Sequence, residues 1–130
     1  MFLSQGIDIV DNRRIEMLFI KYGDVFKKKI LSKDEIIDID KIISQKKKIQ
    51  KISSRFAAKE ATAKAIGIGF RLGLKFTDIE ITYDELGKPK LLLNELIKKN
   101  FLKWKKKISS NVSISNEKNY TVAVVTFFLS

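Results

Sequence analysis

Hydrophobic residues follow two different periods along this chain. Alternation of apolar and polar residues is typical of a strand, whereas apolar spacings of three and four residues are typical of a helix. Alternation or short apolar runs predict strands over 2–10, 76–83, 90–93, 111–115 and 120–129. Helical spacing predicts helices over 12–30, 34–52, 55–67 and 94–107.

Turn and cap signals separate these segments. The sequences DELGKP (84–89) and NEKN (116–119) contain turn-forming residues and predict two hairpins. Ser32 followed by Glu35 matches a capping box, which predicts the start of the second helix. We expect the third helix to end in the glycine-rich segment 67–73 (GIGFRLG), because glycine makes helix continuation costly.

The order of strand, helices, hairpin, helix and hairpin favours an α+β fold with a mostly antiparallel sheet and packed helices. The 130 residues include one proline and no internal repeat or low-complexity linker, so we expect a single domain over 1–130. The segment 120–129 is apolar on both faces. A small sheet rarely covers both faces by itself, so either helices or another subunit should pack over one of them.

The composition excludes several kinds of catalysis. Cysteine and histidine are absent, which removes cysteine nucleophiles, histidine bases and the usual zinc sites. Catalysis would have to use carboxylates, lysine, arginine, hydroxyls, backbone groups or a hard metal such as Mg²⁺. The absence of cysteine, of a secretory signal and of an apolar run near the ~20 residues that span a bilayer leads us to expect a cytoplasmic protein.

The chain is strongly basic, with a formal net charge of +11. Such a charge attracts polyanions, including nucleic acid, anionic membranes, nucleotide phosphates and acidic proteins. The excess is mostly lysine, in runs at 27–29, 46–48 and 105–107, and lysine-rich solvated faces are common. The charge alone therefore leaves the partner open.

Asp8 stands between two isoleucines in a predicted strand, where aspartate is unusual. It could lie on a solvated strand face, cap the following helix, or point from a rigid strand towards a metal or substrate. The residues alone do not decide between these roles.

Glu60 and Lys64 are spaced i, i+4 on one face of a predicted helix. An exposed pair of this kind contributes only about 0.3–0.5 kcal/mol and would have long polar neighbours. The neighbours are instead Phe56, Ala57, Ala61 and Ala63. Such small residues permit close approach of a backbone, a subunit or a ligand. Partly desolvated there, Glu60 would need a partner such as a metal, and Lys64 a partner such as phosphate oxygens.

The other candidate features have simpler explanations. The segment 67–73 could cradle a phosphate with its backbone N–H groups, but it fits neither the P-loop nor the dinucleotide pattern. It also follows a helix instead of opening one. Arg13, Arg14 and Lys21 are polar positions of an amphipathic helix, for which solvation is a sufficient explanation.

Three segments together resemble the signature blocks of the holo-[acyl-carrier-protein] synthase family, the small bacterial type of 4′-phosphopantetheinyl transferase. They are 6–16 (GIDIVDNRRIE), 55–69 (RFAAKEATAKAIGIG) and 112–125 (VSISNEKNYTVAVV). Residues 30–35 and 85–91 resemble further family segments in the right order. The resemblance implies transfer of the 4′-phosphopantetheine arm of coenzyme A to a serine of acyl carrier protein, with release of adenosine 3′,5′-bisphosphate.

The resemblance also implies roles for individual residues. Asp8 and Glu60 resemble the magnesium-binding carboxylates, and Lys64 resembles the lysine that contacts the reacting phosphates. The base that accepts the serine proton would be either Glu60 or a metal-bound water held by Asp8. Coenzyme A would be the co-substrate, and residues in its region are Arg55, Lys64, Gly67, Gly69 and Asn116.

The implied partner is acidic acyl carrier protein, which would meet the first helix at Arg13, Arg14 and Lys21. Family members are commonly homotrimers with active sites between subunits. The chain departs from the family at Asn116, where the family usually has histidine; asparagine forms hydrogen bonds but carries no charge.

Two alternatives to this enzyme remain. A basic nucleic-acid-binding module would explain the lysine excess but neither Asp8 nor the Glu60–Lys64 pair, and aromatic residues do not interleave with the basic runs. A family member without activity has only Asn116 in its favour. We therefore predict neither nucleic acid nor a membrane as partner.

Overall fold

The computed structural model describes residues 1–100 and 108–129 and contains two antiparallel sheets. The larger sheet has the order β1–β5–β4, formed by Phe2–Asp11, Tyr120–Leu129 and Ile108–Asn116. The smaller sheet pairs β2 (Ile79–Tyr83) with β3 (Pro89–Leu93). The predicted α+β class with antiparallel sheets and packed helices is confirmed.

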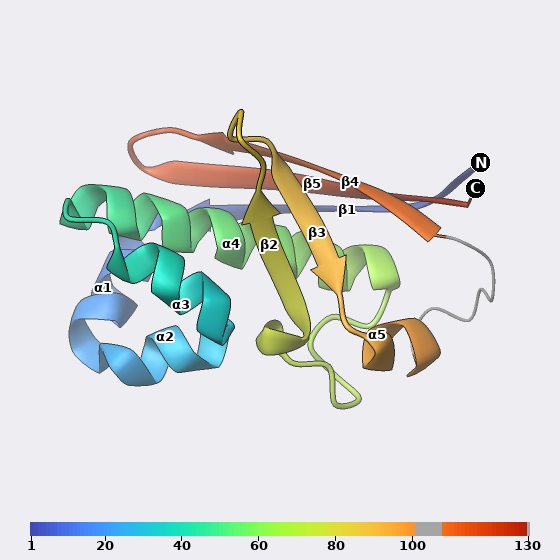
Figure 1. Cartoon of the computed structure of the whole chain (residues 1–130), viewed down its shortest axis with the longest axis horizontal. Coiled ribbons are helices and arrows are strands. Elements are labelled where there is room, and N and C mark those ends of the chain that lie inside the picture. Colours follow the sequence, from blue (N-terminus) through green and yellow to red (C-terminus); the bar gives the residue numbers. More distant parts are fainter. Residues whose placement is uncertain (101–107, 130) are drawn as a thin grey trace.

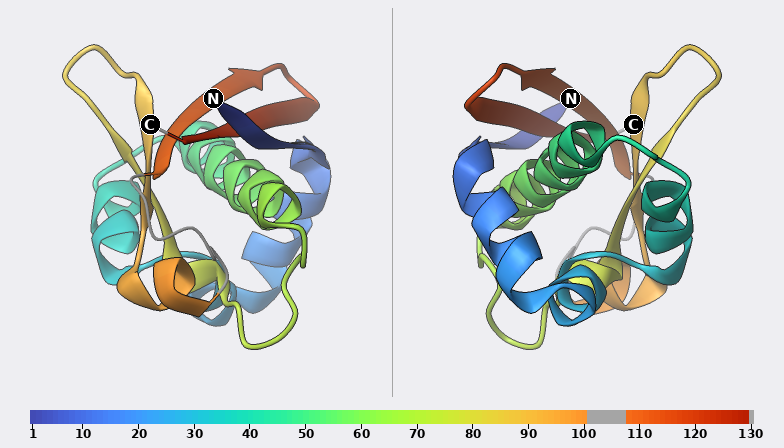
Figure 2. Two further views of the ribbon diagram at one scale, coloured as in Figure 1. Left: turned by 90° about the vertical axis from the view of Figure 1, so that its right-hand side faces the viewer. Right: turned by 90° about the vertical axis from the view of Figure 1, so that its left-hand side faces the viewer.

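The long helix α4 (Gln45–Ile66) is the centre of the molecule (Figure 1). Viewed along this helix, the larger sheet covers one side while the shorter helices and the β2–β3 hairpin surround the others (Figure 2). The shorter helices are α1 (Asn12–Tyr22), α2 (Asp24–Ile30), α3 (Lys33–Asp40) and α5 (Glu95–Asn100). Because neighbours approach α4 from several directions, its second half is almost completely buried, and small residues there allow close packing.

Two helix predictions were wrong in extent. The predicted helix over 12–30 is broken at Gly23, whose φ of 50° lies in a region that glycine adopts readily, and so α1 and α2 are separate. The predicted helix over 34–52 ends at Asp40, and its second half belongs to α4. The Ser44 side chain accepts the Lys47 N–H and begins this new helix as its N-cap.

The local signals for caps and hairpins were reliable. Ser32 and Glu35 form the predicted capping box, and Gly67 ends α4 with a φ of 100°. Both predicted hairpins are present, although a 3₁₀ turn at Phe76–Asp78 precedes β2. The predicted helix over 94–107 is observed as Glu95–Asn100, and 101–107 lie outside the described residues.

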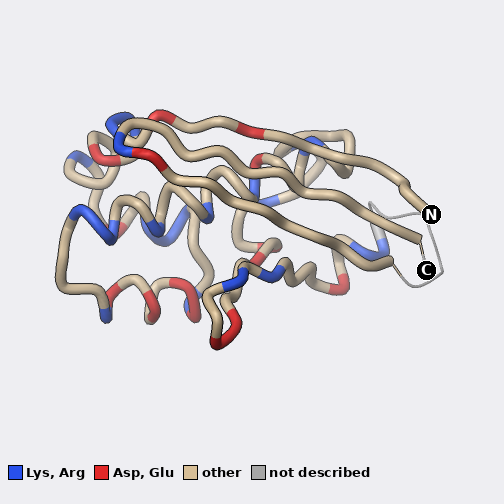
Figure 3. The backbone as a smooth tube through the Cα atoms, turned by 90° about the horizontal axis from the view of Figure 1, so that it is seen from above, with Lys and Arg blue, Asp and Glu red and all other residues tan. Residues whose placement is uncertain are grey.

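The two faces of the larger sheet differ. Residues 121, 123, 125 and 127 of β5 are buried on the face that packs against α4. On the opposite face of β1, Ile7 and Ile9 are 58% and 66% exposed. The three strands carry few charged residues along their length (Figure 3), and β4 and β5 carry none. Helices therefore cover one face and leave a partly apolar face with few charges open. No described helix has both the length and the apolar character needed to cross a bilayer.

The strand β1 and α4 touch backbone to backbone at Gly6. A Cβ atom placed on Gly6 would lie 1.9 Å from Ala61 O and 2.7 Å from Ala65 N. These are backbone atoms, so a side chain at this position could be accommodated only by moving β1 away from the helix. Gly6 is thus required by the packing and not by its backbone conformation.

The change Gly6→Ala should lower the free energy of unfolding by about 3 kcal/mol, near the upper end for overpacked sites, because neither backbone can yield locally. Chemical denaturation measures this cost. The control Gln5→Ala, at an exposed neighbour in the same strand, should cost less than about 1 kcal/mol. Equal stability of the two variants would contradict the close contact.

Candidate functional site

The contact at Gly6 brings Asp8 of β1 beside Lys64 of α4. Lys64 Nζ lies 3.1 Å from Asp8 Oδ1 and donates a second hydrogen bond of 3.0 Å to the carbonyl oxygen of Ile7. The Asp8 side chain is 14% exposed and that of Lys64 is 53% exposed, so the pair lies at the surface with its carboxylate recessed. Lys64 thus bridges helix and strand instead of serving only as an ion-pair partner within its own helix.

Glu60, one turn earlier in α4, is half-buried and close enough to Asp8 to experience its charge. Burial raises the pKa of Glu60 above its ordinary value, and the negative charge of Asp8 raises it further; Lys64 and Arg14 oppose the shift. Two carboxylates from different elements therefore converge with only partial neutralisation. Oxygen ligands of this kind suit a hard cation such as Mg²⁺.

The converging carboxylates number two, not three. Among the described residues, no group of three or more acidic, histidine or cysteine side chains is placed to hold a metal ion. An ion at Asp8 and Glu60 would therefore keep most of its coordination positions for water and for oxygens of a bound substrate.

A groove of about 510 Å³ adjoins Glu60. Its walls come from α1, α2, α4 and the 3₁₀ turn, and its lining residues are Arg14, Leu18, Tyr22, Val25, Phe26, Lys29, Ile30, Phe56, Glu60 and Phe76. The guanidinium of Arg14 lies 6.0 Å from the centre of the Phe56 ring, within the range of a cation–π contact. The groove thus combines a largely apolar lining with two basic side chains, Arg14 and Lys29, and one acidic side chain, Glu60.

The three residues predicted to bind a carrier protein separate in the structure. Arg14 lines the groove. Arg13 instead pairs with Asp11 at 2.8 Å and donates to the Tyr120 hydroxyl at 3.3 Å. Lys21 lies over the Tyr22 ring at 5.3 Å from its centre. Only Arg14 among them is placed directly beside Glu60.

Asn116 belongs to a chain of side-chain hydrogen bonds beside the middle of α4. Its amide donates to Ser54 Oγ at 2.9 Å and to Thr121 Oγ1 at 2.8 Å. Thr121 Oγ1 in turn donates to Asn12 Oδ1. The Asn12 amide nitrogen donates to the carbonyl oxygens of Glu117 and Lys118. These bonds hold the β4–β5 turn against α1 and α4.

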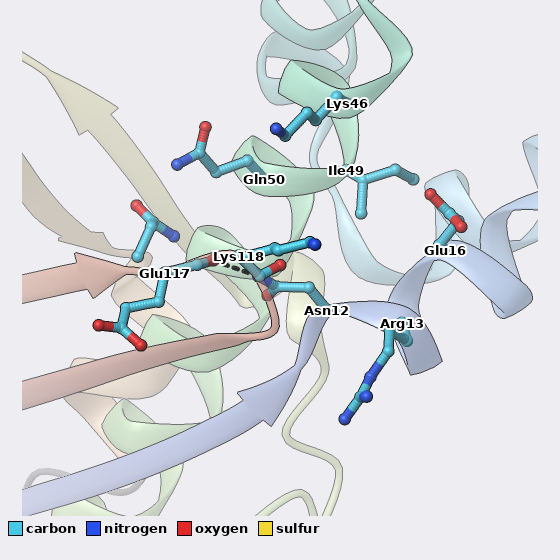
Figure 4. A pocket seen from close by; sticks show the side chains of 9 residues that line it. Asn12, Arg13, Glu16, Lys46, Ile49, Gln50, Glu117 and Lys118 are labelled. Atoms are coloured by element: carbon cyan, nitrogen blue, oxygen red, sulfur yellow. Dashed lines mark hydrogen bonds between the residues drawn. The ribbon is translucent and has the colours of Figure 1, made fainter.

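Asn116 also lines a second pocket, of about 450 Å³ (Figure 4). The remaining lining residues are Asn12, Arg13, Glu16, Lys46, Ile49, Gln50, Glu117 and Lys118. Gln50 and Glu60 are ten residues apart on α4, which corresponds to about 15 Å along the axis. In one chain, this pocket and the Asp8–Glu60–Lys64 cluster are therefore separate.

The predicted cofactor residues Gly67 and Gly69 end α4 just beyond Lys64. Both N–H groups donate to the carbonyl oxygen of Ala63, at 3.1 and 3.2 Å. These two backbone donors are thus occupied by the helix cap, which weakens the case for a phosphate cradle. Their contact with coenzyme A stays a prediction.

Arg55 was also predicted to bind coenzyme A. It lines neither the Asn116 pocket nor the groove beside Glu60. It is 2% exposed, with its side chain against Glu35 (3.4 Å), Asp38 (3.6 Å) and the Tyr83 ring. The geometry gives Arg55 an internal packing role, and its binding of coenzyme A stays a prediction.

Sequence analysis missed the buried pair Glu35–Lys59, which lies inside the molecule next to Arg55. Glu35 matched a local capping box, and this local role gave no reason to expect long-range contacts. Lys59 directly precedes Glu60, and the only available signal was a lysine inside an alanine-rich segment.

Comparison with known proteins identifies the family. Residues 4–125 match the family described as the 4′-phosphopantetheinyl transferase superfamily. The holo-[acyl-carrier-protein] synthase of Pelagibacter ubique is 45% identical over 126 residues, covering 95% of this chain and 94% of that one.

Solved structures of the same family have the same fold. A holo-(acyl-carrier-protein) synthase from Bacillus anthracis, in complex with CoA (3′,5′-ADP), is 32% identical with a TM-score of 0.83, covering 100% of this chain and 99% of that one. The Helicobacter pylori holo-[acyl-carrier-protein] synthase in complex with coenzyme A is 31% identical with a TM-score of 0.81, covering 95% and 99%. The chain therefore belongs to the 4′-phosphopantetheinyl transferase superfamily and, within it, to the holo-[acyl-carrier-protein] synthases.

Proposed function

We propose that this chain transfers 4′-phosphopantetheine from coenzyme A to a serine of apo acyl carrier protein, in a Mg²⁺-dependent reaction that releases adenosine 3′,5′-bisphosphate. The observation that carries the proposal is the convergence of Asp8, Glu60 and Lys64 beside a groove. Relatives crystallised with coenzyme A support the choice of co-substrate. Membership of an enzyme family argues against a non-catalytic nucleic-acid-binding module.

Asp8 and Glu60 would hold Mg²⁺, which stabilises negative charge on the phosphate under attack. Their two carboxylates supply the oxygen ligands that a hard divalent cation prefers. Lys64 has a partly exposed ammonium and can donate to the departing bisphosphate. Glu60 lines the groove, so its carboxylate is one candidate acceptor of the serine proton, and a metal-bound water held by Asp8 is the other.

The groove beside Glu60 is the proposed docking place for the carrier. Its apolar residues would contact an apolar surface, while Arg14 and Lys29 at its walls would attract acidic side chains. A serine presented at the Glu60 end would then reach the reacting phosphate. The net charge of +11 would also speed the encounter with an acidic protein.

A complete site would need more than one copy of the chain. The pocket at Asn116 carries Lys46 and Lys118, which suit phosphate groups, but it is separated from Glu60 along α4. A head-to-tail contact between copies joins opposite ends of neighbouring subunits and closes into a ring. We propose a homotrimer in which such contacts bring the Asn116 pocket of one subunit beside the Asp8–Glu60–Lys64 cluster of the next. The open sheet face would be buried in the same assembly.

A mass-spectrometric assay tests the reaction. Incubation with coenzyme A, Mg²⁺ and apo acyl carrier protein should add one phosphopantetheine to the carrier, and EDTA should stop the addition. Asp8→Asn and Glu60→Gln should each lower kcat/KM at least about 100-fold, because each removes a charged metal ligand. Activity within a few-fold of wild type in either variant would disprove its ligand role.

Glu60 should destabilise the metal-free protein at neutral pH. A carboxyl whose pKa is raised on folding binds more protons in the folded state, so stability falls as pH rises through the window above the ordinary value of 4.5. Glu60→Gln should therefore be more stable than wild type at pH 7, and the difference should shrink as the pH falls towards 4.5.

Denaturation curves across this pH range measure the effect of Glu60→Gln. The exposed carboxylate variant Glu85→Gln controls for the loss of one negative charge. Added Mg²⁺ should raise the Tm of wild type but not that of Glu60→Gln, because binding to the folded state stabilises it. A Glu60→Gln variant less stable than wild type at pH 7 would contradict the assignment.

Light scattering should give a mass of three chains for the wild-type protein. The change Ile9→Lys places a charge on the open sheet face and should yield monomers with loss of transfer activity. Ile43→Lys, at a fully exposed position between α3 and α4, is the control and should leave the mass unchanged. A monomeric wild-type enzyme with full activity would disprove the composite site.

A further inference from the structure

A buried ion pair lies directly behind the functional face of α4. Lys59 is 0% exposed and Glu35 is 1% exposed, and Lys59 Nζ donates to Glu35 Oε1. Consecutive helical residues point about 100° apart, so Lys59 extends into the interior while Glu60 faces the groove. The proposed reaction uses Glu60 but gives no role to Lys59.

Glu35 connects three elements with its two oxygens. Oε1 accepts the Ser32 N–H of the α3 cap as well as the Lys59 ammonium, and Oε2 accepts the Ile81 N–H of β2 at 3.0 Å. The carboxylate is therefore fixed by backbone donors before Lys59 is considered. Lys59 adds α4 to this assembly.

The second contact of Lys59 reaches the wall of the groove. Its Nζ donates at 2.7 Å to the carbonyl oxygen of Ile30, the last residue of α2. Among residues 1–100 and 108–129, this is the one hydrogen bond that joins α2 to α4. Ile30 and Phe26 line the groove from α2, while Phe56 and Glu60 line it from α4. Lys59 thus ties together the two walls between which the carrier is proposed to dock.

Stability alone does not account for such a pair. Moving both charges out of water is costly, and apolar residues of similar volume often serve as well or better for stability. A lysine that reaches both a carboxylate and a helix-end carbonyl oxygen does something an apolar side chain cannot do: it specifies where the end of α2 lies relative to α4.

We propose that Lys59 is a positioning residue that sets the width of the groove for the carrier protein, acting through Ile30 O. This inference rests on the proposed function, because it assumes that the carrier docks in the groove. It predicts an effect on carrier recognition that is separate from effects on coenzyme A, on the chemical step and on folding.

The test compares steady-state kinetics of Lys59→Met with wild type, well below the Tm of each protein. Methionine keeps an unbranched apolar stem but donates no hydrogen bond to Ile30 O. The KM for the carrier should rise about tenfold or more, while kcat changes less than about threefold and the KM for coenzyme A less than about twofold. Fluorescence anisotropy with labelled apo carrier should show the same weakening without turnover.

The matched control is Lys27→Met. Lys27 also belongs to α2 and is 13% exposed, but it pairs with Asp24 and with Asp40 of α3. Its loss removes charge pairing from the same helix without removing a contact to α4. The KM for the carrier should therefore stay within about twofold of wild type, whatever the change in Tm.

A second variant separates positioning from stability. Glu35→Gln removes the charge partner but leaves Lys59 able to donate to Ile30 O, so it should lower the Tm while raising the carrier KM far less than Lys59→Met. If Lys59→Met does not fold, the double variant Glu35→Gln/Lys59→Met, which removes both charges of the buried pair and still lacks a donor to Ile30 O, is compared with Glu35→Gln alone. An unchanged carrier KM in the folded Lys59 variant, or carrier KM values that simply follow the Tm in all variants, would overturn the proposal.

Failure of the inference can be told from failure of the proposed function. If wild type does not modify the carrier at all, the proposed function is wrong. If wild type transfers normally and the Lys59 variants keep a normal carrier KM, only the positioning role of Lys59 is wrong.

Discussion

The direct contact of β1 with α4 at Gly6 is the constraint on which the rest of the structure depends. With no side chain between Gly6 and the helix backbone at Ala61 and Ala65, Asp8 comes within hydrogen-bonding distance of Lys64. Larger residues at these places would separate strand from helix and pull the two carboxylates apart. The small residues around Glu60 therefore have a structural explanation first, and the meeting of Asp8, Glu60 and Lys64 is its consequence.

The central helix carries two kinds of charge that serve different purposes. On its interior side, Arg55 and Lys59 face Glu35, whose oxygens accept several donors at once. On its outer side, Glu60 has a raised pKa and incomplete compensation. Paired interior charges hold the surrounding elements in place, and the underpaired outer carboxylate remains free to take a cation.

The sequence predicted what is encoded locally and missed what long-range packing decides. The capping box at Ser32, the two hairpins and the end of α4 at Gly67 each depend on a few adjacent residues, and all are present. The start of α4 was missed because isoleucine spacing continues through the break before Ser44, and so the pattern resembles one long helix. Gly23 was overlooked for the same reason, since apolar spacing persists on both sides of it.

The site shows the same division between local motif and distant contact. The sequence singled out Asp8, Glu60 and Lys64 by their unusual neighbours and by the family-like segments that contain them. It could not predict that Lys64 pairs with Asp8, because this contact depends on how β1 crosses α4. Glu35 matched a local motif, and nothing local indicates that its carboxylate also reaches Lys59 and β2. Arg55 lies in a family-like segment, yet its burial follows from the packing of α3 and β2 against the helix.

Asn116, at the position where the sequence resemblance leads one to expect histidine, is held by hydrogen bonds within the fold. Its amide is engaged with Ser54 and Thr121 and belongs to a chain of bonds that shapes the neighbouring pocket. The position therefore acts through hydrogen bonding, which asparagine supplies as well as a neutral histidine does. Lys46, Lys118 and Arg13 bring positive charge to the pocket, and Glu16 and Glu117 bring negative charge. Asparagine carries no charge itself, so the charge of this pocket is set by the surrounding side chains while the Asn116 amide holds the β4–β5 turn in place.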